Sequence, residues 1–123
     1  MNYVLKLINV YWIAISMFIL AAITLLSLYP LANLPQVPGS DKTHHFIAYG
    51  ALMFPVAIRK PKYWLLIGLF FIVWSGVIEL IQPYVNRYGE WLDLAANAAG
   101  IVCGIIVARG LILITPLNIK VNE

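Results

Sequence analysis

The chain has 123 residues, of which 63% are hydrophobic and 11% are charged, with a formal net charge of +3. Soluble domains are about 45–50% apolar and about 25% charged, so this composition excludes an ordinary soluble domain. The length allows one small domain, which we expect to occupy residues 1–123. The basic balance does not indicate nucleic-acid binding, because no basic stripe with interleaved aromatic residues is present. We therefore expect an integral membrane protein whose surroundings are the lipid bilayer.

The first apolar run predicts a membrane-spanning helix over residues 7–28. Residues 10–28 contain no charged side chain, and a spanning helix needs about 20 predominantly apolar residues. A cleaved signal peptide is the alternative, since Lys6 precedes the run, but the apolar region of a signal peptide is only about 7–15 residues long. No clear small-x-small cleavage site follows, so we expect the segment to be retained.

Three further apolar runs predict helices over residues 42–58, 63–82 and 91–114. The helix over 42–58 is the shortest and least apolar, and Pro55 can kink its inner end. A tight basic turn separates it from the next helix, which ends at Pro83. The sequence therefore predicts an all-α polytopic membrane protein built as a bundle of four transmembrane helices.

The basic residues predict the orientation of this bundle. Six of the eight Lys and Arg side chains lie in the N-terminal segment, the second loop and the C-terminal region: Lys6, Arg59, Lys60, Lys62, Arg109 and Lys120. Four of the five acidic residues lie at the opposite ends of the helices. Because cytoplasmic segments carry an excess of Lys and Arg, we predict that both termini are cytoplasmic.

Side chains capable of chemistry gather at the helix ends predicted to lie outside the cytoplasm. In a series of helical hairpins, the start of the second helix, the end of the third and the start of the fourth lie at one face of the membrane. Helical spacing also places the polar residues of each helix on one side: Asp41, His45 and Tyr49; Ser75, Glu79 and Gln82; Asp93 and Asn97. Ionisable groups at membrane depth are costly and usually functional, so we predict a single polar site.

We assign roles in this site by residue type. The groups suited to acid–base catalysis are His45, Glu79 and Asp93. The residues expected to bind a ligand are Asp41, Lys42, Tyr49, Gln82, Arg87 and Asn97. Each also has a structural alternative, such as an ion pair between Glu79 and Arg87 or interhelical hydrogen bonds from the two amides. The three catalytic candidates could bind a divalent ion, but no ligand spacing enforces it, and we predict neither a metal nor a cofactor.

Small residues recur at every fourth position of the last helix. Ala96, Gly100 and Gly104 form a pattern that lets helices approach closely in lipid. The pattern permits a homo-oligomer as well as packing within the chain. We favour internal packing, because the pattern continues the polar stripe of Asp93 and Asn97.

These motifs resemble those of VanZ-like membrane proteins. The run Asp41-Lys42-x-x-His45-Phe46-x-x-Tyr49-Gly50-x-Leu52 is similar to the first signature of that family. Glu79-Leu80-x-Gln82, then Arg87, then Asp93-x-x-x-Asn97-x-x-Gly100-x-x-x-Gly104 resemble the remainder, in family order. The resemblance implies a bacterial cytoplasmic membrane and a cell-envelope role that affects susceptibility to teicoplanin-type glycopeptide antibiotics.

Three functions remain open. The favoured one is a site that binds or modifies a lipid-linked envelope intermediate or a glycopeptide. The second is an intramembrane enzyme that uses His45, Glu79 and Asp93 on a lipid-linked substrate, although no recognisable nucleophile motif is present. The third is a small proton-coupled transporter, which the apolar inner halves of the helices disfavour.

Overall fold

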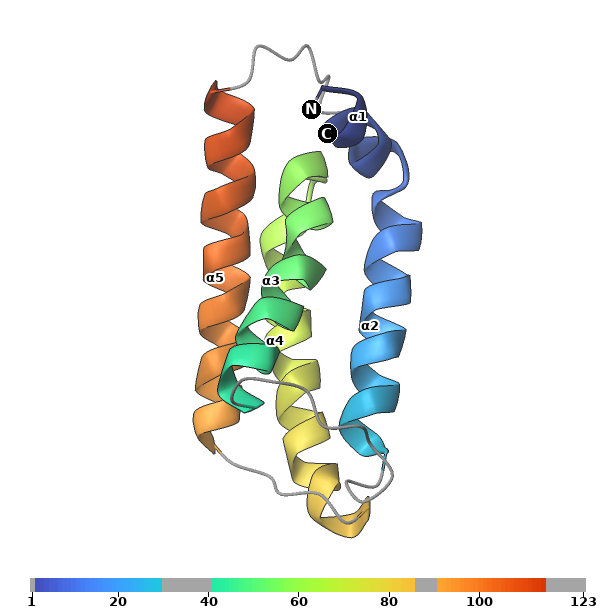
Figure 1. The fold of residues 1–123 in the computed structure, drawn as a ribbon, viewed down its shortest axis with the longest axis vertical. Helices are drawn as coiled ribbons and strands as arrows, with labels where there is room; N and C mark the ends of the chain where they lie inside the picture. Colours follow the sequence, from blue (N-terminus) through green and yellow to red (C-terminus); the bar gives the residue numbers. More distant parts are fainter. Residues whose placement is uncertain (1, 30–40, 86–90, 115–123) are drawn as a thin grey trace.

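A computed structural model describes residues 2–29, 41–85 and 91–114, and all regular structure in these residues is helical. The elements are α1 (Asn2–Val10), α2 (Trp12–Leu28), α3 (Asp41–Arg59), α4 (Trp64–Ile81), the short 3-10 helix η2 (Gln82–Val85) and α5 (Trp91–Ile114). The four long helices run up and down along one axis (Figure 1). The start of α3, the end of α4 and the start of α5 therefore lie toward the same end of the bundle.

The central helix of the bundle is α3. It contacts α1, α2, α4 and α5, and its most extensive contact is with α5. Five residues in its second half are 0% exposed: Leu52, Met53, Val56, Ala57 and Ile58. The second half of α3, residues 51–58, is apolar on every side, and such a segment is typically buried among other helices. The helix continues through Pro55 to Arg59.

Glycines allow α3 and α5 to pack with their backbones close together. A Cβ atom at Gly104 would lie 2.5 Å from the carbonyl oxygen of Gly50, and one at Gly100 would overlap the carbonyl oxygen of Phe46. Gly100 and Gly104 thus face α3 of the same chain, which is the internal packing that we favoured for this pattern. A homo-oligomer through the pattern stays a prediction.

The segment expected to form one span over residues 7–28 is divided in the structure. Helices α1 and α2 meet at a bend of 77° around Tyr11. The first helix lies at the end of the bundle where α3 ends and α4 begins (Figure 1). There Leu5 is buried against apolar residues of α3 and α5, and Arg59 Nη1 donates a hydrogen bond to the carbonyl oxygen of Asn9 at 3.5 Å. Contacts with the bundle therefore hold α1 at an angle to α2.

Two helical stretches among the described residues are long and apolar enough to cross a membrane. They are Trp64–Tyr84 and Trp91–Ile114, and the bent pair of α1 and α2 would make a third. The structure therefore shows an all-helical protein with two or three candidate membrane spans. The fourth span and the cytoplasmic placement of both termini stay predictions.

Candidate functional site

Three helices bring three ionisable side chains together at one end of the bundle. His45 lies near the start of α3, Glu79 in the last turn of α4 and Asp93 in the first turn of α5. One ring nitrogen and one oxygen from each carboxylate lie within 4.8 Å of one another. The alternating direction of the helices produces this meeting, because α3 and α5 begin where α4 ends (Figure 1).

The carboxylates of this cluster are buried. Glu79 is 5% exposed and Asp93 is 6% exposed, whereas His45 is half-buried. An ionised carboxylate loses its hydration on burial, so the protein must supply compensating charge or hydrogen bonds. One such group is Lys42, whose Nζ lies 3.9 Å from Asp93 Oδ1 while its side chain remains 46% exposed. The cluster therefore reaches the surface of the bundle through Lys42.

Asn97 fixes the orientation of His45. The Oδ1 atom of this fully buried asparagine lies 3.0 Å from His45 Nδ1. Because an amide oxygen only accepts hydrogen bonds, the ring nitrogen Nδ1 is the donor. In the neutral imidazole, Nε2 then carries the lone pair, so this contact selects one tautomer of His45.

Other residues predicted for the site have different contacts. Gln82 is buried, and its Nε2 donates a hydrogen bond to the carbonyl oxygen of Ser27 at 3.1 Å, which joins η2 to α2. Tyr49 is buried in the apolar core, where it lies close enough to Glu79 for an electrostatic interaction. Asp41 is the first residue of α3, but its side chain lies outside the described residues, as does the whole of Arg87.

Helix α2 also makes polar contacts, which the sequence did not lead us to predict. Thr24 Oγ1 accepts a hydrogen bond from Trp74 Nε1 at 3.0 Å, and the Ser27 carbonyl accepts one from Gln82. Ser16 and Ser27 are both buried on α2. They are eleven residues apart, or three helical turns, so they lie on the same side of the helix. This spacing could have predicted that one side of α2 is buried and polar.

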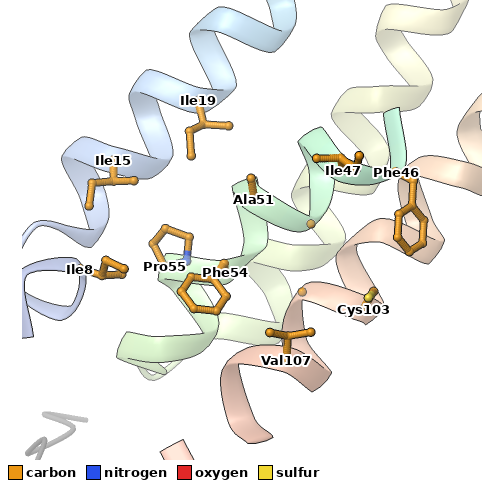
Figure 2. A pocket seen from close by; sticks show the side chains of 12 residues that line it. Ile8, Ile15, Ile19, Phe46, Ile47, Ala51, Phe54, Pro55, Cys103 and Val107 are labelled. Atoms are coloured by element: carbon orange, nitrogen blue, oxygen red, sulfur yellow. The ribbon is translucent and has the colours of Figure 1, made fainter. Parts of the chain in front are cut away.

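An apolar groove of about 480 Å³ lies on another face of α3 (Figure 2). Its lining comes from α1, α2, α3 and α5: Ile8, Ile15, Ile19, Phe46, Ile47, Gly50, Ala51, Phe54, Pro55, Cys103, Gly104 and Val107. On α3, Gly50 and Phe54 are rotated by about 140–180° from His45, at 100° per residue. The groove therefore presents a hydrocarbon surface that is separate from the polar cluster.

A comparison with protein families matches the VanZ/LLP1 model over residues 3–114. The chain belongs to this family. The match confirms the resemblance predicted from the motifs, and it covers the whole of α3, α4 and α5, which carry His45, Glu79 and Asp93. No curated protein and no solved structure matches the chain.

Proposed function

We propose that this VanZ-like chain acts in the bacterial cell envelope and alters susceptibility to teicoplanin-type glycopeptides. In this proposal the chain crosses the cytoplasmic membrane four times, with both termini inside and the polar site outside. The site binds or modifies a lipid-linked envelope intermediate or the antibiotic itself. The observation that carries the proposal is the convergence of His45, Glu79 and Asp93, with both carboxylates buried.

The burial of these carboxylates supports a function beyond helix packing. Interhelical amide and hydroxyl contacts in membranes contribute about 0.6–2 kcal/mol each without placing charge in the bundle. The chain has such contacts between α2 and α4, for example from Trp74 to Thr24. Two buried carboxylates beside a histidine are a more costly arrangement, and intramembrane ionisable groups commonly mark ligand or proton sites.

The charges of the site suit a ligand that carries both anionic groups and hydrogen-bond donors. Lys42 is half exposed beside Asp93 and can pair with a phosphate or carboxylate of a bound molecule. The carboxylates can accept hydrogen bonds from amines and hydroxyls. Lipid-linked envelope intermediates and glycopeptides carry both kinds of group, so one site can serve either ligand.

The distribution of basic residues supports the orientation. Arg59 is the last residue of α3, Lys60 and Lys62 lie between α3 and α4, and Arg109 lies near the end of α5. These positions are at the opposite end of the bundle from Glu79 and Asp93 (Figure 1). Since basic segments favour the cytoplasmic side, the polar site would face outward.

The test is glycopeptide susceptibility in a sensitive bacterial host at matched membrane levels of each variant. We expect the wild-type chain to raise the inhibitory concentration of teicoplanin more than that of vancomycin. Glu79→Gln keeps the shape of the side chain but removes its charge, and we expect it to return the host to the susceptibility of the empty strain. Glu123→Gln is the matched control, because it makes the same change near the C-terminus. If the host that expresses the wild-type chain is as susceptible as the host without it, the chain has no role in glycopeptide susceptibility.

A second candidate is an intramembrane enzyme, and the contact between His45 and Asn97 favours it. A histidine whose ring is oriented by Asn97, beside two carboxylates, provides the groups that acid–base catalysis requires. Mass spectrometry of envelope lipids separates the two functions. A lipid that changes in the wild-type strain but not in the His45→Gln strain indicates catalysis, whereas protection with unchanged lipids indicates binding alone.

A further inference from the structure

We propose that His45, Glu79 and Asp93 bind a divalent transition-metal ion, either Zn²⁺ or Mn²⁺. The inference concerns the site of the proposed function and rests on that site being functional. It does not depend on which envelope ligand the site takes. No motif in the sequence indicates it, because the three ligands come from three helices.

The distances between the three side chains are close to those that one ion requires. Their ligand atoms lie within 4.8 Å of one another. Zinc binds nitrogen at about 2.0–2.1 Å and carboxylate oxygen at about 2.0–2.2 Å, so two ligands of one ion are at most about 4.4 Å apart. Small rotations about the side-chain torsions of Glu79 and Asp93 would bring the atoms to coordinating distance. The backbone of the bundle need not move.

The donor set selects the class of ion. An imidazole nitrogen favours transition metals over Mg²⁺ and Ca²⁺, and carboxylates suit both Zn²⁺ and Mn²⁺. Three protein ligands leave a coordination position for water or substrate, as in catalytic zinc sites. A metal-binding histidine usually donates its other ring N–H to a protein acceptor, and Asn97 Oδ1 accepts from His45 Nδ1 at 3.0 Å. The hydrogen bond leaves the Nε2 lone pair for the ion.

The charge of the cluster also favours a cation. Glu79 and Asp93 are buried side by side, and two carboxylates at this separation repel each other when both are ionised. Lys42 pairs with Asp93 from a half-exposed position at 3.9 Å. A divalent ion between the carboxylates would compensate both charges at once, in a place where solvent screens little.

The experiment measures metal binding by the full-length chain in detergent micelles. The protein is purified through an affinity tag without histidines, stripped with a chelator and dialysed against Zn²⁺ or Mn²⁺. Bound metal is then measured by elemental analysis. We expect about one ion per wild-type chain and at least a tenfold loss of affinity in His45→Gln and Glu79→Gln. His44→Gln is the matched control, because the neighbouring histidine is rotated by about 100° on the same helix.

Folding is checked separately, since either variant could lose metal by losing structure. Helical circular dichroism and the elution volume of the micelle should be the same for His45→Gln, Glu79→Gln, His44→Gln and the wild type. The absorption spectrum of Co²⁺ in the wild-type protein provides a second measurement, with a ligand-field band expected for a four- or five-coordinate site. Absence of stoichiometric metal in the wild type, or equal affinity in folded His45→Gln and wild type, would overturn the proposal.

These outcomes are distinct from failure of the proposed function. A wild-type chain that binds metal without protecting the host supports the metal site and removes the antibiotic role. A chain that protects the host through Glu79 but binds no metal supports the antibiotic role and removes the metal site. The two measurements share a variant but not a readout.

Discussion

At the residue scale, two glycines of α5 set how closely the helix packs against α3. The added Cβ of Gly104→Ala would lie 2.5 Å from the carbonyl oxygen of Gly50, and that of Gly100→Ala would meet the carbonyl oxygen of Phe46. Both obstacles are backbone atoms, which cannot rotate away as the end of a side chain can. The two helices must therefore move apart.

We expect Gly100→Ala and Gly104→Ala each to destabilise the chain by about 1–3 kcal/mol, as overpacking in a close-packed interior does. Gly110→Ala is the control on the same helix, because its Cβ would meet no atom within 4 Å. The control should be neutral or stabilising, since alanine favours the helix over glycine. Thermal unfolding in detergent, followed by helical circular dichroism, measures the difference. Equal melting of all three variants would contradict the close approach of α3 and α5.

The sequence predicts which polar residues share a helix face but not which neighbour each of them meets. Helical spacing and the hairpin series selected His45, Glu79 and Asp93, which the structure brings together. The same reasoning placed Gln82 in the site, whereas its amide bonds to the Ser27 carbonyl of α2. The difference arises because the acceptor is a backbone carbonyl, and the sequence does not show which backbone carbonyls lie near Gln82.

At the element scale, the bend between α1 and α2 has a tertiary cause. Residues 7–28 contain neither proline nor glycine, so local preference predicts one continuous helix. The structure bends at Tyr11, where Leu5 packs into the end of the bundle and Arg59 bonds to the Asn9 carbonyl. Contacts between residues far apart in the sequence outweigh the local preference for a continuous helix. The apolar pattern of the segment does not predict these contacts.

The end of α3 depends on a hydrogen bond from α5. The carbonyl oxygen of Ala57 would normally accept a bond from the N–H four residues later, but that residue is Pro61, which has none. Arg109 Nη1 donates to this carbonyl at 3.2 Å instead, and Ala57 is fully buried. The arginine therefore satisfies an acceptor that the proline leaves unpaired within its own helix.

We expect Arg109→Leu to destabilise the chain by about 1–3 kcal/mol, the range for a buried acceptor that loses its donor. Lys62→Leu is the control, because it also removes a positive charge near the end of α3 but leaves the bond from Arg109 to Ala57 in place. Unfolding in detergent as a function of temperature compares the two variants. A loss of stability in Lys62→Leu equal to that in Arg109→Leu would assign the effect to charge rather than to the Ala57 carbonyl.

At the scale of the whole molecule, the two ends of the bundle differ in charge. One end has the basic turn of residues 59–62 and Arg109, and the other has the cluster of His45, Glu79 and Asp93 with Lys42 beside it. The order of residues along the chain predicts this separation, because each group lies at a helix end and the helices alternate in direction. The function of the site depends on which end faces the outside of the cell.

Single cysteines at the two ends test the orientation. In a Cys103→Ala background, we expect Lys42→Cys to react with a membrane-impermeant maleimide in unbroken cells, because residue 42 is half exposed at the site end. We expect Lys62→Cys, at the exposed basic end, to react only after the cells are opened. The reverse pattern would place the polar site in the cytoplasm, where an antibiotic acting outside the membrane does not reach it. That result would contradict the proposed glycopeptide role. It would not affect the packing of α3 against α5 or the proposed metal site, since neither depends on the orientation of the chain in the membrane.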